Sequence, residues 1–230
     1  MKMIGLIGGM SWESSLEYYR LVNQAVKARL GGLHSARCLM YSVDFAEIEV
    51  LQHEGRWAEA GQALVSAAQG LERGGADFLV LCTNTMHKLA GEIQAGTRLP
   101  LLHIADAAAR RIQQAGLRRI GLLGTRFTMQ EDFYRGRLAQ QFGLEVLIPD
   151  AGDRQEVHRV IYDELVLGEI RPASRDAYLR IIERLVAGGA QGVILGCTEI
   201  GLLVRDGDCA VPLFDTTRIH AEEAVDYALQ

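Results

Sequence analysis

The sequence lacks an excess of positive charge and any long apolar run. Its 24 lysine and arginine residues are outnumbered by 29 aspartate and glutamate residues, so the net charge is -5. This balance argues against a nucleic-acid or anionic-membrane partner. No apolar run approaches the roughly 20 residues that span a bilayer, and the start MKMIGLIGGM is typical of a strand rather than a signal peptide. We therefore expect a cytoplasmic protein with a small-molecule partner.

Paired cysteines and nucleotide-binding loops are also missing. The four cysteines Cys38, Cys82, Cys197 and Cys209 are far apart and form no CxxC pair, which predicts neither a disulfide framework nor a zinc site. The six histidines are scattered without ligand spacing. Neither GxGxxG nor GxxxxGK[ST] is present. We expect reduced thiols and no metal site.

Short apolar runs alternate with longer segments of helical period through all 230 residues. This alternation predicts an α/β fold with mostly parallel sheets. The expected strands are 3–7, 36–42, 78–82, 101–104, 120–123, 146–148, 192–195 and 212–214. The expected helices are 11–28, 56–73, 106–114, 130–142, 154–167, 174–187 and 217–229.

The two halves of the sequence repeat each other in order. MIGLIGGM resembles RIGLLGTRFT, GGADFLVLCTNT resembles GGAQGVILGCTEI, and LPLLHIAD resembles VPLFDTT. The matched residues are Gly5 with Gly121, Gly74 with Gly188, and Pro100 with Pro212, at offsets of 116, 114 and 112. The second match sets Thr83 opposite Cys197. The alternative is that any two βα units share Gly-Gly-Ala helix ends and valine-rich strands.

The repeat predicts two similar lobes related by pseudo-twofold symmetry, with a ligand site between them beyond the carboxyl ends of the strands. We expect residues 1–112 plus 213–230 to form the N-terminal lobe and residues 113–212 to form the second. The turn 8–11 follows the first strand, and Gly124, Thr125 and Thr128 follow its counterpart. Their backbone and hydroxyl donors suit a carboxylate, although each turn is equally explained as a tight turn with an N-cap.

Five segments resemble landmarks of the aspartate/glutamate racemase family, which includes glutamate, hydantoin and broad-specificity amino-acid racemases. They are GLIGGMSWESS, SVDF at Ser42, CTNTMHK at Cys82, GLLGT at Gly121 and GCTEIGLL at Gly196, and they cover nearly the whole chain. The resemblance implies an isomerase in which each lobe offers one cysteine. One thiolate removes the α-proton of an amino acid and the opposite thiol returns a proton, without pyridoxal phosphate or a metal. It also implies a possible homodimer.

By this resemblance the catalytic pair is Cys197 and Thr83, because Thr83 replaces the first family cysteine. Cys197 is the expected base, with a thiol pKa lowered by helix N-termini or neighbours; the alternative is an inert buried cysteine. Because side chains alternate along a strand, Cys82 is expected in the core. The other expected substrate contacts are Met10, Gln52, Asn84, Thr85, Thr125, Thr128, Thr198 and Glu199.

The replacement of a thiol by a hydroxyl predicts an asymmetric enzyme. Cys197 would abstract the α-proton of the L-enantiomer, and Thr83 or a water that it holds would reprotonate the opposite face. Aspartate and glutamate are the default substrates, and neutral or polar amino acids are close behind. Lys88, Arg126 and His87 are either site residues or ordinary structural ones. A one-cysteine lyase or decarboxylase and a non-catalytic amino-acid sensor are the competing functions.

Overall fold

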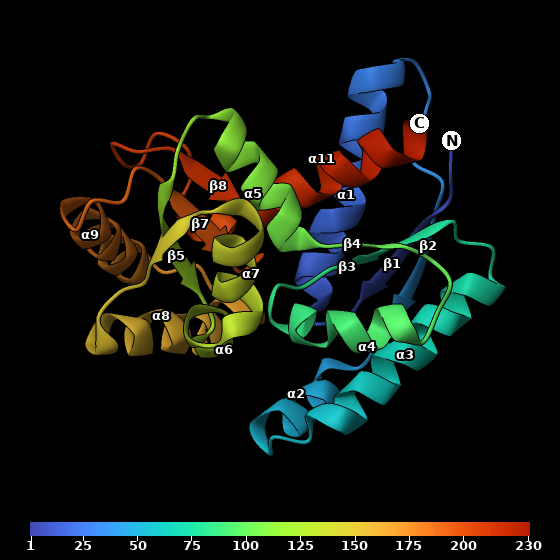
Figure 1. The fold of residues 1–230 in the computed structure, drawn as a ribbon, viewed down its shortest axis with the longest axis horizontal. Helices are drawn as coiled ribbons and strands as arrows, with labels where there is room; N and C mark the ends of the chain where they lie inside the picture. The colour runs from blue at the N-terminus through green and yellow to red at the C-terminus, as the bar shows by residue number, and fades with distance from the viewer. The chain divides into compact units, whose positions relative to one another are not determined.

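Eight short apolar segments form two separate four-stranded parallel sheets in the computed structural model, which describes residues 1–230. The chain divides into unit 1, Met1–His103 with His220–Gln230, and unit 2, Ile104–Ile219. Each unit contains one sheet with helices packed against it (Figure 1). This arrangement confirms the expected α/β class.

Unit 1 is built on the strand order β2-β1-β3-β4. Its strands are β1 (Ile4–Gly8), β2 (Cys38–Ser42), β3 (Phe78–Leu81) and β4 (Leu101–Leu102). Its helices are α1 (Trp12–Leu30), α2 (Phe45–His53), α3 (Trp57–Arg73), the 3₁₀ helix η1 (Thr85–Leu89), α4 (Ala90–Ala95) and most of α11 (Thr216–Leu229). All four β3 residues are buried, as expected for a strand covered on both faces.

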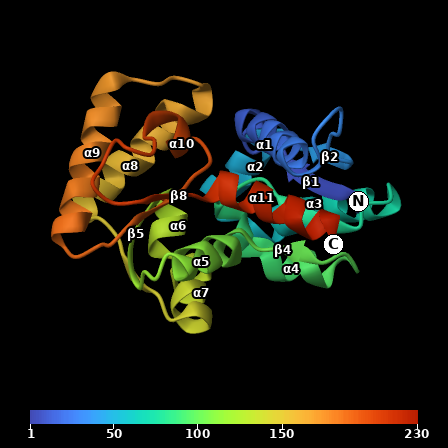
Figure 2. The ribbon, with the colours of Figure 1, turned by 90° about the horizontal axis from the view of Figure 1, so that it is seen from above.

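Both faces of the unit 1 sheet are covered because successive side chains on a strand point to opposite sides. Leu6 lies in the cluster that α1 and α11 contribute to, while Ile7 lies in the cluster formed with α2, α3 and α4. Figure 2 shows α11 alongside α1 in this unit. The apolar residues of α3 recur at helical spacing, and Leu64 and Leu71 are buried on its inner side.

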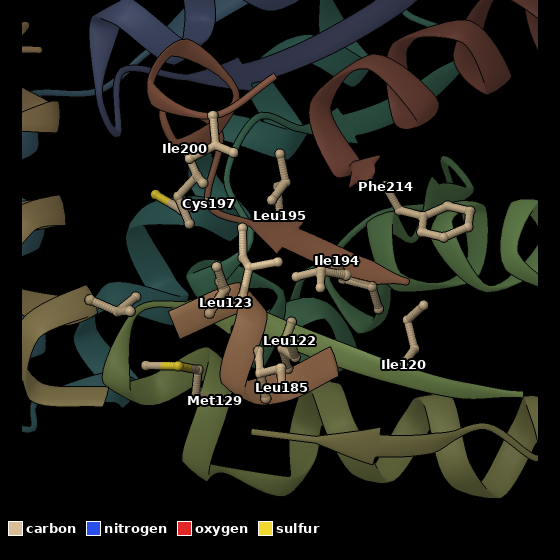
Figure 3. Packing of buried hydrophobic residues seen from close by; sticks show 14 of the residues in the cluster. Ile120, Leu122, Leu123, Met129, Leu185, Ile194, Leu195, Cys197, Ile200 and Phe214 are labelled. Carbon is tan, nitrogen blue, oxygen red and sulfur yellow. The ribbon is translucent and has the colours of Figure 1, made fainter. Parts of the chain in front are cut away.

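Unit 2 has the equivalent strand order β6-β5-β7-β8. Its strands are β5 (Arg119–Gly124), β6 (Glu145–Leu147), β7 (Val193–Gly196) and β8 (Leu213–Asp215). Its helices are α5 (Ile104–Gln114), α6 (Arg126–Gln130), α7 (Asp132–Phe142), α8 (Ala151–Asp163), the 3₁₀ helix η2 (Leu165–Leu167), α9 (Pro172–Ala187) and α10 (Ile200–Leu203). Figure 3 shows its core, in which Cys197 lies just beyond Leu195 and next to Ile200.

The pairing register of the two sheets reproduces the sequence repeat. Gly5 pairs with Leu79 in unit 1, and Gly121 pairs with Val193 in unit 2. Positions 5 and 121 are 116 apart, and positions 79 and 193 are 114 apart. The fourth strands continue the series, because the partners of positions 79 and 193 are positions 101 and 213, which are 112 apart. The three offsets are those found in the sequence, so the two units are equivalent strand by strand.

The helix after the fourth strand of each sheet belongs to the other unit. α5 follows β4 but packs in the core of unit 2, and α11 follows β8 but contributes Ala221, Ala224 and Val225 to unit 1. This exchange places the unit limits at residues 103–104 and 219–220. The lobes expected from the sequence, 1–112 plus 213–230 and 113–212, stay a prediction as functional domains.

Several helices differ from the sequence expectation: the short helices η1, α4, α6 and α10 were not expected, and the helix expected over 130–142 begins at Asp132 as α7. The helix expected over 154–167 ends at Asp163, because Glu164 leaves the helical conformation and its buried side chain turns to partners in α8 and α9. α2 was not expected, although Asp44 caps it by accepting from the backbone N–H of Ala46. No helix is both long and apolar enough to cross a membrane.

Candidate active site

Cys197 stands at the carboxyl end of β7, where two glycines allow β5 and β7 to approach closely. Gly124 pairs with Gly196. A Cβ atom on Gly124 would lie 2.9 Å from the carbonyl oxygen of Gly196, closer than real contacts of this kind. Cys197 therefore follows a strand end whose geometry depends on the absence of side chains at both positions.

The thiol of Cys197 shares a carboxylate with its neighbour. Its Sγ donates to Oε2 of Glu199 at 3.0 Å, and the Oγ1 of Thr198 donates to the same oxygen. All three side chains are buried. The sequence CTE thus places a nucleophilic thiol, a hydroxyl and an acidic acceptor at one point, and the structure brings together the three residues expected there.

The pKa of the Cys197 thiol shifts in the direction opposite to the one expected from the sequence. Burial raises the pKa of Cys197 well above its ordinary value, and the charge of Glu199 and its hydrogen bond to the thiol raise it further. Backbone hydrogen bonds at Glu199 and Thr198 act in the opposite direction. The expected lowering of this pKa is therefore wrong for the enclosed thiol beside a carboxylate. The protonated thiol is therefore favoured in this arrangement, through burial first and Glu199 second.

Thr125 and Thr128 follow β5 at the same edge of the sheet. Thr125 is the N-cap of α6, since its Oγ1 accepts from the backbone N–H of Thr128 at 3.3 Å. The Thr128 side chain is fully buried and packs against Gly124 and Gly196. Both threonines thus support the ends of β5 and β7, and their contact with substrate stays a prediction.

Thr83 occupies in unit 1 the position that Cys197 occupies in unit 2. Ile7 pairs with Leu81 and Leu123 pairs with Leu195, and each catalytic candidate lies two residues beyond the second member. Thr83, Asn84 and Thr85 are all buried at this strand end. The register thus supports the equivalence drawn from the repeat.

Cys82 does not substitute for the missing thiol. Its side chain is fully buried in the cluster beneath α1 and α11, together with Phe78 and Val80. Burial raises the pKa of Cys82, and nearby Cys38 raises it further. The prediction that Cys82 belongs to the core is confirmed.

Met10 and Gln52 lie in unit 1 near the residues that follow β3. The Nε2 of Gln52 is 2.8 Å from the Sδ of Met86, and Met10 belongs to the same buried cluster as Met86. This group offers an amide and two thioethers. Nearby on η1, Lys88 places its ammonium 3.9 Å from the ring centroid of Trp57.

The turn after β1 is held by hydrogen bonds to the start of α1 and by close packing against Val43. The backbone N–H of Gly9 donates to the Oγ of Ser15 at 2.7 Å, and Ser11 caps α1 by accepting from the N–H of Ser14. Gly9 has φ of +93°, and a Cβ atom there would lie 2.1 Å from the carbonyl oxygen of Val43. Only glycine fits this approach. The turn holds the carboxyl ends of β1 and β2 together.

His87 had no firm role in the sequence analysis, and the structure places it against Thr83. Its Nδ1 lies 2.7 Å from the carbonyl oxygen of Thr83, and its side chain is buried. The available signal was the four-residue spacing, which brings side chain and carbonyl together on a helical turn. Among the described residues 1–230, no group of three or more His, Cys, Asp or Glu side chains is arranged to hold a metal ion.

Comparisons with known proteins agree with this geometry. The model of the Asp/Glu/hydantoin racemase family matches residues 7–224. A broad-specificity amino-acid racemase, RacX, of Bacillus subtilis (strain 168) is 24% identical over 228 residues, which is 97% of this chain and 96% of that protein.

Two solved structures are similar over their full lengths. A proposed Asp/Glu racemase from Yersinia pestis is 60% identical, with a TM-score of 0.93 and 100% of both chains covered. An aspartate racemase homologue from Pyrococcus horikoshii OT3 is 34% identical, with a TM-score of 0.87 and 100% of both chains covered. With its repeated sheets and the thiol at the end of β7, the chain belongs to the Asp/Glu/hydantoin racemase family and is an amino-acid racemase, an isomerase.

Proposed function

We propose that this racemase works with unlike groups on the two faces of its substrate: Cys197 removes the α-proton of an L-amino acid, and the Thr83 side returns a proton to the opposite face. The observation that carries the proposal is the register equivalence of Thr83 and Cys197 at the ends of β3 and β7. Inversion at a tetrahedral carbon needs a base on one face and an acid on the other, and a duplicated unit supplies two such positions.

The proton transfers balance without a cofactor. The Cys197 thiolate takes the α-hydrogen, so that an S–H bond forms while the C–H electron pair stays on the substrate and spreads into its carboxylate. A new C–H bond then forms on the other face with a proton from the Thr83 hydroxyl or a water that it holds. A hydroxyl is a far weaker acid than a thiol, so this second step is the slower one.

Glu199 connects substrate binding to formation of the thiolate. Its carboxylate accepts from Cys197 and Thr198 and raises the pKa of Cys197. An amino-acid ammonium bound to Glu199 would neutralise this charge and compete for the same oxygen. The α-ammonium would thereby weaken two of the causes that keep the thiol protonated, while burial, the largest cause, and the backbone hydrogen bonds that favour the thiolate remain. We therefore assign Glu199 to the ammonium group.

Aspartate and glutamate are the proposed default substrates, and neutral or polar amino acids are the second choice. The second choice is supported by the group of Met10, Gln52 and Met86 in unit 1, which carries no basic side chain. Lys88 is held over Trp57, and Arg126 is exposed with its guanidinium 5.3 Å from the ring centroid of Phe127. Neither contact shows a cation bound where the side-chain carboxylate of aspartate or glutamate would lie.

The test is a substrate screen in D₂O. Proton NMR follows loss of the α-hydrogen signal from L-aspartate, L-glutamate and several neutral L-amino acids, and chiral chromatography measures the D-isomer. Cys197-dependent hydrogen loss with D-isomer formation is expected, and Cys197→Ala is the negative control. Carbon dioxide release from a substituted malonate without amino-acid exchange would instead indicate a lyase. Ligand-induced thermal stabilisation without any exchange would indicate a sensor.

A further inference from the structure

His158 on α8 is joined to the turn that follows β5. Its Nδ1 accepts a hydrogen bond from the backbone N–H of Arg126, with 3.3 Å between the two nitrogens. Because a backbone N–H only donates, this ring nitrogen carries no hydrogen. The imidazole in this contact is therefore neutral, and its hydrogen is on Nε2. Both residues belong to unit 2, which also contains Cys197.

Ring contacts keep the imidazole of His158 in this position. Its centroid lies 4.7 Å from that of Tyr162, which is one turn further along α8. The ring of Phe127 on α6 meets it edge-on, with the centroids 6.5 Å apart and an interplanar angle of 88°. Tilted and edge-to-face arrangements are favourable for such ring pairs. The His158 ring thus packs against its own helix and against α6.

α6 needs acceptors at its start because it contains only five residues. A helix this short is not stable by itself, and its first backbone N–H groups have no acceptor inside the helix. The Oγ1 of Thr125 accepts from the N–H of Thr128, and His158 accepts from the N–H of Arg126. Thr125 and Thr128, two of the expected substrate contacts, therefore lie in a turn that two side-chain acceptors hold.

The position of α6 is also linked to the strand end that carries Cys197. The Cβ of Thr128 lies 3.1 Å from the place of a Cβ atom on Gly124, and its Cγ2 lies 3.4 Å from that on Gly196. The hydroxyl oxygens of Thr125 and Thr128 are 3.2 Å apart. A shift of α6 therefore moves both threonines relative to the residue that precedes Cys197.

Protonation of His158 removes the acceptor. Both nitrogens of an imidazolium ring donate, so Nδ1 can no longer accept from the Arg126 N–H. The new charge on the ring also repels the Arg126 guanidinium. Two bonds and one turn of helix geometry thus depend on a side chain that changes charge in mild acid.

The surroundings of His158 decide where this change occurs. Burial and the charge of Arg126 lower the pKa of His158, and Asp163 on α8 acts in the opposite direction. Tyr162 is the other titratable group in contact with the ring. No charged group of β5, η2 or α9, which also pack against α8, is among the causes of the shift. The neutral form is therefore present at neutral pH and is lost as the pH falls below the ordinary value of about 6.5.

We propose that His158 is a positioning residue for the turn after β5: its neutral ring holds the Arg126 N–H, and its protonation in mild acid releases the turn and weakens substrate binding. This inference rests on the predicted contact of Thr125 and Thr128 with the substrate of the proposed racemase. It adds a pH-dependent support to that side of the site.

The experiment measures binding of L-aspartate by calorimetry between about pH 5 and 8. A Cys197→Ala background prevents turnover and removes the ionisation of the thiol from the profile. With His158 present, we expect the dissociation constant to be constant above about pH 6.5 and to rise by about three- to tenfold in acid, as loss of one hydrogen bond predicts.

Two substitutions of His158 separate positioning from simple packing. His158→Asn offers a carbonyl oxygen that accepts from the Arg126 N–H and does not titrate, so binding should stay tight and the rise in acid should disappear. His158→Leu fills the space without an acceptor, so the dissociation constant should be raised at every pH. His34→Asn, at an exposed position between α1 and β2, is the matched control and should keep the rise in acid.

A second measurement needs no substrate. In the native protein the NMR shift of the Arg126 amide proton should change with the same midpoint as the His158 ring, and in His158→Asn it should not change. An Arg126 amide that ignores the His158 titration would overturn the inference. So would a rise in the dissociation constant that persists in His158→Asn. Absence of α-hydrogen exchange together with intact pH-dependent binding would overturn the proposed racemisation instead, and would leave this inference standing.

Discussion

The strand ends of β3 and β7 have the same backbone register but different chemistry. In unit 2 the position carries Cys197, hydrogen-bonded to Glu199. In unit 1 it carries Thr83, whose carbonyl is bound by His87. The duplicated sheet preserves where two groups stand, whereas the side chains decide what each can do. The comparison teaches that a duplicated fold can carry unlike side chains at equivalent positions.

The largest expected effect comes from removing the one thiol at these positions. Cys197→Ala should lower both α-hydrogen exchange and inversion of L-substrates by about a thousandfold or more, because the base is lost. Proton NMR in D₂O measures both. Cys82→Ala is the control, since Cys82 is a core residue, and its exchange rate per folded molecule should stay near that of the native protein. A Cys197→Ala variant that retains exchange would contradict the assignment of Cys197 as the base.

Making the two positions alike should sharpen the comparison. Thr83→Cys places a thiol at the end of β3, where its S–H group can return a proton to the substrate. Inversion of L-substrates relative to exchange with retention should rise by about tenfold or more. The control is Thr83→Ser, which keeps a hydroxyl and should keep the native ratio. A Thr83→Cys ratio no higher than that of Thr83→Ser would show that this position does not limit inversion.

Glu199 should control the ionisation of Cys197. Its charge and hydrogen bond both raise the pKa of this thiol, so Glu199→Gln should shift the pH profile of thiol alkylation to lower pH. The rate of iodoacetamide reaction followed by mass spectrometry measures the profile. Glu183→Gln, at an exposed position of α9, is the control and should not shift it. An upward shift in Glu199→Gln would contradict the assigned electrostatics.

The smallest effect concerns stability at the ends of α2 and α8, which follow equivalent strands. In unit 1 buried Gln52 contacts Met86, whereas in unit 2 buried Glu164 accepts from Arg159 at 3.0 Å and from Ser174 at 2.5 Å. Burial acts to raise the pKa of Glu164, but the bonds from Ser174 and Arg159 outweigh it, and the pKa is lowered. The ionised form is therefore favoured by folding.

A lowered folded-state pKa stabilises the protein above the unfolded value of about 4.3 and loses that contribution as the pH falls below it. Glu164→Gln should lower the free energy of unfolding by about 1–2 kcal/mol at neutral pH, and the difference from the native protein should shrink in acid. Urea unfolding at several pH values measures it. Glu169→Gln, which alters an exposed ion pair, should have a smaller effect. If the difference in the free energy of unfolding between Glu164→Gln and the native protein grew in acid, the lowered pKa of Glu164 would be contradicted.

The sequence predicted the sheet well because buried parallel strands are continuous apolar runs. All eight expected strands are present, and the repeat offsets match the pairing register. α2 was not predicted because it is short and buries only Ile48 and Gln52, although Asp44 is a typical N-cap residue. The helix expected over 154–167 was too long, because the turn of Glu164 toward Ser174 depends on a contact between two helices.

The candidate site was predictable in its residues but not in its energetics. The motifs identified Cys197, Thr198 and Glu199, which lie together. The direction of the Cys197 pKa was wrong, because burial and the orientation of Glu199 are properties of the folded chain. The contact of His87 with Thr83 depended on the 3₁₀ turn of η1, which leaves no periodic apolar signal.

The most direct test of unlike groups at equivalent positions is to start from each enantiomer separately in D₂O and measure exchange with retention and inversion in one sample. Because the enantiomers have equal free energy, kcat/KM for full turnover must be the same in both directions. Exchange with retention should nevertheless outrun inversion for the L-substrate, which meets Cys197, and not for the D-substrate. Equally fast exchange of both enantiomers without inversion would contradict the account.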